Sequence, residues 1–205
     1  MELIAERRHV DQDNSCLFSS IGYLMSPKEF NELTKYKYRQ IIAEAIINNK
    51  SKYNAVFLGR SIDDYLSFIQ NPDNWGGEIE LKIFSDVYKI EIVNIQVETL
   101  KMFTYGSGEG YSNRIYVLYT GIHYDPLVMT LNNTSDDITI FSSFDLEIQN
   151  KFINLVKVFQ SAKDFVNLSN VMKLQCTDCN SIFNTQDEAT NHASTTNHWN
   201  YDEIH

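Results

Sequence analysis

A cysteine stands at residue 16, directly after the polar run Asp13, Asn14 and Ser15 and before an apolar segment with helical spacing. A thiol in the first turn of a helix feels the positive end of the helix dipole, which favours the nucleophilic thiolate. The preceding loop can aim backbone N–H groups at an oxyanion that develops beside Cys16. A free cysteine is more often a small buried hydrophobic residue. A catalytic interpretation therefore requires a base within reach of the thiol.

His123 is the best candidate for that base. The other four histidines lie near a terminus or in the metal-binding pattern described below, whereas His123 follows an apolar segment typical of a strand. Side chains two residues apart on an extended chain point to the same side, so Asp125 could orient the imidazole ring. A histidine without a catalytic role fits this spacing equally well. The residues alone leave both interpretations open.

The C-terminal segment carries two cysteines and two histidines at the spacing of a zinc finger. Two residues separate Cys176 from Cys179, and five separate His192 from His198. Two thiolates and two imidazoles in this order can close a tetrahedral Zn²⁺ site. The pattern predicts a structural metal site formed by these four residues.

Further residues of this segment support a finger and argue against DNA binding. Phe183 occupies the position of the core aromatic, and residues 185–188 form a capping box for the helix that carries the histidines. Ala189 stands where leucine is usual, which should weaken the small core. Residues 174–205 contain no Lys or Arg, so nothing there can neutralise phosphates. We expect a structural or protein-binding finger.

Composition limits the class of protein and its partners. The 205 residues, 43% of them hydrophobic, suffice for one packed domain and a small appendage. A net charge of −10 disfavours nucleic acid and favours basic protein surfaces as partners. No signal peptide is recognisable, and no apolar stretch approaches the ~20 residues of a membrane span. These features predict a cytoplasmic or nuclear protein with three unpaired cysteines.

Hydrophobic periodicity predicts helices first and strands later. We expect helices over 16–25, 28–49, 61–71 and 77–88, and strands over 89–97, 100–105, 114–121 and 123–129. This order indicates an α/β or α+β domain over residues 1–147. A long helix is predicted over 145–166. It should form the first part of a connecting segment at 148–173, which leads to the finger at 174–205.

Three segments together resemble the OTU (ovarian-tumour) family of cysteine deubiquitinases. They are DQDNSCLF at 11–18, WGGEIEL at 75–81 and GIHYDPL at 121–127. The C-terminal Cys/His segment resembles the finger of the family's OTU1-type branch, so the similarity covers nearly the whole chain. It implies a papain-like α+β protease domain, with a mixed sheet flanked by helices, and a ββα finger holding structural Zn²⁺. Catalysis itself would need no cofactor.

The resemblance also implies roles for individual residues. Cys16 would be the nucleophile and His123 the general base. The third member of the catalytic triad would be Asp13 or Asp125, and the motif does not distinguish between them. The residues expected to contact the substrate are Asn14, Ser15, Trp75, Gly76, Gly77, Ile122 and Tyr124.

The implied reaction is hydrolysis of isopeptide bonds at the C-terminal glycine of ubiquitin. The implied partners are ubiquitin, polyubiquitin chains and a ubiquitin-selective AAA ATPase that acts in ER-associated degradation. That branch docks on the ATPase through an N-terminal ubiquitin-like domain, which this sequence does not include. The alternative hypothesis is a non-catalytic, ubiquitin-binding zinc-finger adaptor.

Overall fold

A mixed sheet forms the centre of the larger of two folded units. The computed structural model describes residues 3–131, 136–165, 173–183, 186–198 and 201–204. The strands of this sheet are β1 (Leu3–Arg7), β2 (Glu91–Gln96), β3 (Met102–Tyr105), β4 (Asn113–Tyr119), β5 (Tyr124–Leu131), β6 (Asp137–Ile138) and β7 (Phe141–Ser142). Their order is β1-β5-β4-β2-β3, with β6 beside β5 and β7 beside β4. Only the β2–β4 pair runs parallel among the described strands.

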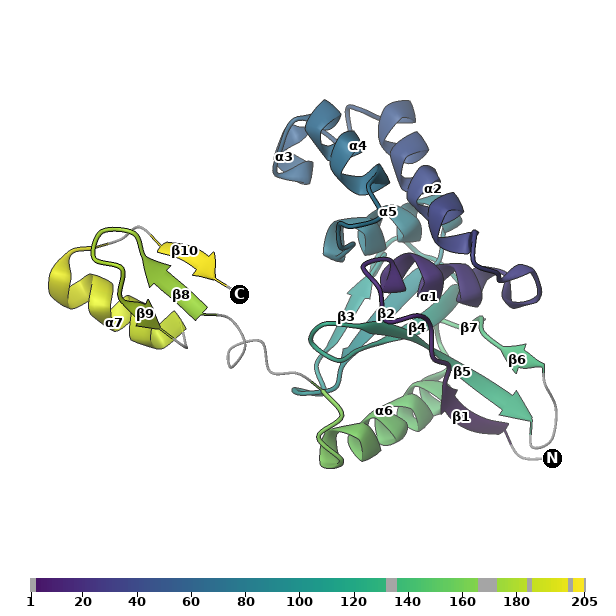
Figure 1. Cartoon of the computed structure of the whole chain (residues 1–205). Coiled ribbons are helices and arrows are strands. Elements are labelled where there is room, and N and C mark those ends of the chain that lie inside the picture. The colour runs from purple at the N-terminus through teal and green to yellow at the C-terminus, as the bar shows by residue number, and fades with distance from the viewer. Residues whose placement is uncertain (1–2, 132–135, 166–172, 184–185, 199–200, 205) are drawn as a thin grey trace.

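Helices cover both faces of this sheet. They are α1 (Cys16–Met25), α2 (Thr34–Asn48), α3 (Ala55–Leu58), α4 (Ile62–Gln70), α5 (Glu78–Tyr88) and α6 (Leu146–Ser161), with a 3-10 turn, η1, over Pro27–Glu29. Successive strand side chains point to opposite faces. Ile92 and Val117 therefore join the core beneath α1 to α5, whereas Val93 and Tyr116 join the core beneath α6 (Figure 1). The result is the α+β fold with a flanked mixed sheet that the sequence predicts.

Local signals set the helix boundaries near the site. Helix α4 starts at Ser61, whose hydroxyl accepts from the Asp64 N–H at 3.1 Å, and it ends two residues before Pro72. Helix α5 starts at Gly77, whose N–H donates to the Glu80 carboxylate at 2.7 Å. Such contacts satisfy N–H groups that have no partner inside the helix. The predicted helices over 61–71 and 77–88 are confirmed.

The predicted helix over 28–49 is shorter than expected. A turn precedes α2: the Asn31 N–H donates to the Thr34 hydroxyl, and the Leu33 N–H donates to the Asn31 side chain, both at 2.9 Å. These side-chain contacts compete with helical hydrogen bonding, so the regular helix starts only at Thr34.

Helix α6 belongs to the core of the larger unit, which differs from the predicted linker at 148–173. Its residues Ile148, Phe152 and Val156 are buried against sheet residues that include Tyr116 and Met129. The apolar stripe therefore covers the second face of the sheet. The helix begins after the Asp145 cap and ends at Ser161, before the predicted end at 166.

The C-terminal unit is a small β-sheet with one helix. Its elements are β8 (Lys173–Cys176), β9 (Ile182–Phe183), α7 (Gln186–Thr196) and β10 (Tyr201–Ile204), and β8 pairs antiparallel with both other strands. Strand β10 adds to the predicted ββα pattern. Phe183 packs on the ring of His192, with centroids 4.8 Å apart. Thr185, the first residue of the predicted capping box, lies outside the described residues, as does the side chain of Ala189.

No described helix combines the length and apolar character that crossing a lipid bilayer would require.

Candidate active site

Cys16 is the first residue of α1 and lies against the start of β5. The residue is buried, with 7% of its surface exposed. The backbone N–H of Tyr124 donates to Cys16 Sγ at 3.4 Å. The thiol is therefore fixed between a helix N-terminus and a strand N-terminus, which are 108 residues apart in the sequence.

Asp125 in β5 and His123, which directly precedes this strand, lie at the same point. His123 Nε2 lies 3.1 Å from Asp125 Oδ1, and both side chains are buried. Burial alone would lower the pKa of His123, but hydrogen bonds to Asp125 and to Cys16 outweigh it and raise the pKa to about 9. His123 is therefore protonated at neutral pH, and it interacts with the thiol on one side and the carboxylate on the other.

Asp125 is the carboxylate that contacts His123. Its Oδ1 also accepts from the Val10 N–H at 3.0 Å, and its Oδ2 accepts from Arg7 Nε at 2.6 Å. Burial favours the neutral acid, but the contacts with His123, Val10 and Arg7 prevail and hold the pKa of Asp125 below its usual range. The carboxylate is ionised although it is completely buried.

Asp13 has a different set of contacts. Its Oδ1 accepts from the Ser15 N–H at 2.8 Å, and its Oδ2 pairs with Lys35 Nζ at 2.6 Å. These contacts fix the loop before Cys16. Of the two carboxylates that the sequence left open, Asp125 rather than Asp13 hydrogen-bonds to His123.

A buried arginine that the sequence analysis missed holds this loop in place. Arg39 Nη2 donates to the hydroxyl of Ser15 at 2.9 Å and to the carbonyl oxygens of Asn14 and Asn74 at 3.0 and 2.7 Å. Its guanidinium stacks on Phe18 at 4.1 Å. The side chain of Ser15, a predicted substrate contact, is buried and accepts this hydrogen bond from Arg39.

The predicted substrate-contacting residues otherwise surround one cavity. It measures about 230 Å³ and contains Cys16 in its wall. Its lining includes the predicted residues Asn14, Trp75, Gly76, Gly77, Ile122 and Tyr124, and also Glu78, Asn94, Gln96 and Tyr119, which the sequence analysis did not single out. Glu78 lies in the WGGEIEL segment, whereas Asn94, Gln96 and Tyr119 belong to no motif and reach the cavity because strands β2 and β4 place them there.

Gly76 is required by close packing in this wall. A Cβ atom at residue 76 would lie 2.7 Å from the Phe18 ring and 2.9 Å from the Leu17 side chain. The segment that carries Trp75 therefore lies directly against α1, beside the thiol. The indole N–H of Trp75 donates to the Asn14 side chain and links the two loops.

A second cavity, of about 480 Å³, lies on the His123 side. Asn14, Trp75 and Ile122 line both cavities, so they stand between them. The thiol is in the wall of the smaller cavity and the imidazole in the wall of the larger one. The acyl group of a substrate could therefore lie in the smaller cavity and its leaving group in the larger one, on opposite sides of Asn14, Trp75 and Ile122.

The loop before Cys16 offers one backbone donor to a ligand. The N–H groups of Asp13, Ser15 and Cys16 donate within the loop, to Asp11 O, Asp13 Oδ1 and Asp13 O. The N–H of Asn14 has no acceptor among the described residues. Of the backbone N–H groups in residues 13–16 that were expected to bind the oxyanion, the N–H of Asn14 is the one left to do so.

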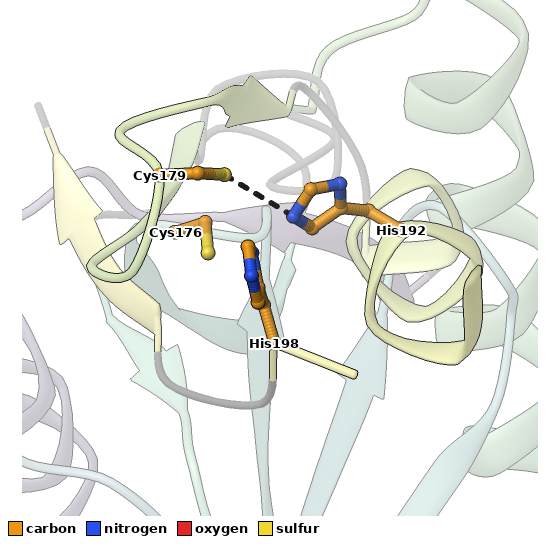
Figure 2. Close-up of side chains that lie close together, drawn as sticks. All are labelled: Cys176, Cys179, His192 and His198. Carbon is orange, nitrogen blue, oxygen red and sulfur yellow. Dashed lines mark hydrogen bonds between the residues drawn. The ribbon is translucent and has the colours of Figure 1, made fainter. Parts of the chain in front are cut away.

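The four predicted metal ligands converge in the C-terminal unit. The ligand atoms of Cys176, Cys179, His192 and His198 all lie within 4.8 Å of one another, and Figure 2 shows the side chains pointing to a common centre. Hydrogen bonds from Ser181 chiefly lower the pKa of Cys179 to about 6, so this thiol is ionised at neutral pH, as metal ligation requires. Two thiols and two imidazoles fit a tetrahedral metal ion.

A thiol at a helix N-terminus, a protonated imidazole and an ionised carboxylate, held together on a mixed sheet, define a cysteine protease.

Comparison with known proteins agrees with this class. Residues 11–131 match the family described as OTU-like cysteine protease, and residues 170–204 match the "Ubiquitin thioesterase OTU1, C-terminal C2H2-type zinc finger". A protein of Arabidopsis thaliana named "OVARIAN TUMOR DOMAIN-containing deubiquitinating enzyme 2" is 38% identical over 99% of both chains. The chain belongs to the OTU-like cysteine protease family.

Two further relatives define the extent of the likeness. "Ubiquitin thioesterase OTU1" of Dictyostelium discoideum is 41% identical over 97% of this chain, which spans 61% of that protein's length. A solved "Structure of Ovarian Tumor (OTU) domain in complex with Ubiquitin" is 26% identical, with a TM-score of 0.69 over 80% of this chain and 92% of the other.

Proposed function

We propose that this chain is a thiol-dependent deubiquitinase, which hydrolyses the isopeptide bond between the C-terminal glycine of ubiquitin and a lysine amine. The observation that most directly supports this proposal is that Cys16 interacts with His123, and His123 with the ionised Asp125, at the edge of a narrow cavity. The names of the Arabidopsis and Dictyostelium relatives support the same reaction.

The first half of the reaction forms a thioester. The Cys16 thiolate attacks the carbonyl carbon of the terminal glycine, and the Asn14 N–H donates to the oxyanion that develops. Protonated His123 then gives its proton to the lysine nitrogen as the C–N bond breaks. Asp125 keeps the ring aligned and stabilises its charge throughout.

The second half releases ubiquitin. Neutral His123 accepts a proton from water, the hydroxide attacks the thioester carbonyl, and the C–S bond breaks to regenerate the Cys16 thiolate. The amine leaves on the side of the larger cavity, where His123 lies.

The smaller cavity suits a diglycine tail. A Cβ atom at Gly77 would meet open space, so this glycine leaves room for a bound main chain without side chains, and the exposed carboxylate of Glu78 suits the basic residues of the ubiquitin tail. Asn94 is 3% exposed, and its Oδ1 has no hydrogen-bond partner among the described residues. A bound peptide N–H would satisfy this oxygen.

For the finger, we propose that the bound metal is structural Zn²⁺, held by Cys176, Cys179, His192 and His198. When bound, the ion would supply no chemistry to hydrolysis and would cross-link β8, α7 and the residues that follow α7. Both the donor set and the matched finger family support zinc over other ions.

The association with a ubiquitin-selective AAA ATPase, the role in ER-associated degradation and the cytoplasmic or nuclear location stay predictions. Co-purification with the ATPase from cell extract, followed by imaging of the tagged chain, would test them.

A ubiquitin probe with a C-terminal electrophile tests the proposed activity. We expect wild type and Cys179→Ser to form a ubiquitin-sized covalent adduct, and Cys16→Ser to form none, because Cys16 lies in the cavity wall beside the His123–Asp125 pair, whereas Cys179 belongs to the metal-ligand cluster. The readout is the mass of the adduct. If folded wild type binds ubiquitin without forming an adduct, the adaptor hypothesis replaces the proposed one.

A further inference from the structure

Arg7, the last residue of β1, is buried with its charge. Only 8% of its side chain is exposed. Its Nε donates to Asp125 Oδ2 at 2.6 Å, and its Nη1 donates to Asp164 Oδ2 at 2.5 Å. The guanidinium also stacks on the ring of Phe159, 5.3 Å from the centroid. Arg7 therefore joins the carboxylate beside His123 to the end of α6.

These contacts come from both ends of the larger unit. Strand β1 pairs with β5, with Arg7 opposite Leu127, and this register brings the arginine to Asp125. Phe159 lies in α6 and Asp164 just after it. All three residues lie outside 11–131, the segment that matches the OTU-like cysteine protease family.

The two oxygens of Asp125 have separate partners. Oδ1 faces His123 and the Val10 N–H, whereas Oδ2 accepts from Arg7 at 2.6 Å, with His9 Nδ1 farther away at 3.7 Å. A completely buried carboxylate with an empty Oδ2 would rotate to recover hydrogen bonds or would take up a proton. Either change would weaken its hold on the imidazole.

We propose that Arg7 is a positioning residue for the reaction, which fixes the Asp125 carboxylate toward His123 and is itself held by Asp164 and Phe159. The inference rests on the proposed function for its catalytic readout. Arg7 and Asp164 line the larger cavity together with His123. The hydrogen bond that links Arg7 to the catalytic residues goes to Asp125, so we infer its effect through that carboxylate.

The test compares Arg7→Gln with Arg8→Gln. Arg8 is adjacent in sequence and makes its own paired hydrogen bonds, to Asp137 at 2.7 Å, away from the site. Both variants lose an arginine–carboxylate pair, but only one of these carboxylates contacts His123. We expect Arg7→Gln to lower kcat about tenfold with KM nearly unchanged, and Arg8→Gln to keep the wild-type kcat. Arg7→Lys should recover most of the loss, and Asp164→Asn should cause a smaller one.

The pH profile separates positioning from general loss of structure. The titratable and charged groups that face His123 and Asp125 are Cys16, Arg7 and His9, with Asp164 behind Arg7. Without Arg7, Asp125 rotates or takes up a proton and no longer opposes the effect of burial, which lowers the pKa of His123. The alkaline limb of kcat should therefore move downward by about 0.5 to 1 pH unit, whereas loss of the Arg7 charge with Asp125 still in place would move it upward. In Arg8→Gln the limb should not move.

A wild-type kcat and pH profile in Arg7→Gln would overturn the inference, as would equal losses in Arg7→Gln and Arg8→Gln. NMR titration of the His123 ring supplies a readout that needs no activity. If wild type does not cleave ubiquitin, the proposed function fails, whereas a downward shift of the ring titration in Arg7→Gln alone would still support the positioning role. An unshifted titration, or one shifted upward, would reject it.

Discussion

At the scale of single residues, the charge on His123 determines how the site responds to pH. Its pKa is raised to about 9 by Asp125 and Cys16, against the effect of burial. The form that protonates the leaving amine is therefore present below this value and is lost as the pH rises through it. We expect an alkaline limb of kcat/KM near pH 9, measured with a ubiquitin substrate that carries a fluorogenic leaving group.

Asp125→Asn should move the alkaline limb of kcat/KM to lower pH. Burial lowers the pKa of His123, and the variant lacks the charged carboxylate that opposes this effect. The pKa, and with it the limb, should therefore fall toward the ordinary histidine value of about 6.5. We also expect kcat to drop by roughly 10³-fold or more, since the ring loses its alignment. The same pH titration of kcat/KM measures both effects.

Asp13→Asn is the matched control for Asp125→Asn. Asp13 binds the Ser15 N–H and Lys35, with no recorded hydrogen bond to His123, so the limb should stay near pH 9 in this variant. A limb that moved in Asp13→Asn and not in Asp125→Asn would reverse the assignment of the third residue.

Single residues also show what the sequence could and could not predict. Cys16 and His123 were candidates from residue type and spacing, but only the family resemblance assigned them catalytic roles, and it left Asp13 and Asp125 as alternatives for the third residue. Arg7 and Arg39 were missed, because a surface arginine and a buried one are identical in sequence. Only the pairing of β1 with β5, and the packing of α2 beside α1, give them their partners.

At the scale of elements, α2 supports two loops of the site through one side chain. Arg39 is 1% exposed and donates to Ser15, Asn14, Asn74 and, through Nη1 at 2.9 Å, to the Ile69 carbonyl. Arg39→Ala would leave these acceptors buried without donors. We expect the free energy of unfolding to fall by about 3–5 kcal/mol, measured by urea denaturation.

Lys37→Ala provides the control on the same helix. Lys37 is exposed, so its replacement should change the free energy of unfolding by no more than about 0.5 kcal/mol. If Arg39→Ala were as mild as this control, the two loops would not depend on Arg39 for their structure.

Element boundaries were predictable where a cap or a proline marks them. Ser61, Pro72 and Gly77 delimit α4 and α5 at the expected places. The apolar stripe of α6 was predicted correctly, but the sequence of such a stripe does not show which surface it packs against. The sequence analysis therefore assigned α6 to a linker, whereas it completes the core.

At the scale of the whole molecule, the two units have different sources of stability. The larger unit has two extensive apolar cores. In the described part of the finger, Cys176 and Ala193 are the buried apolar residues, so a bound metal would have to supply much of its folding free energy.

Removal of metal should therefore unfold the finger selectively. With a strong chelator, we expect the NMR signals of residues 173–204 to collapse to unfolded positions, while the melting temperature of the larger unit stays within about 2 °C. Cleavage of the small fluorogenic ubiquitin substrate should persist. A large fall in the main melting temperature would show instead that the two units fold together.

The contacts of Arg7 have a consequence for the newly made chain. They join residues 118 and 157 positions apart in the sequence. During translation, Cys16 and His123 leave the ribosome well before Asp164 does. The arginine that secures the catalytic carboxylate thus gains its last anchor only when nearly the whole larger unit has emerged. A nascent chain would therefore acquire full hydrolytic power only after Asp164 has emerged, later than the synthesis of Cys16 and His123 alone would suggest.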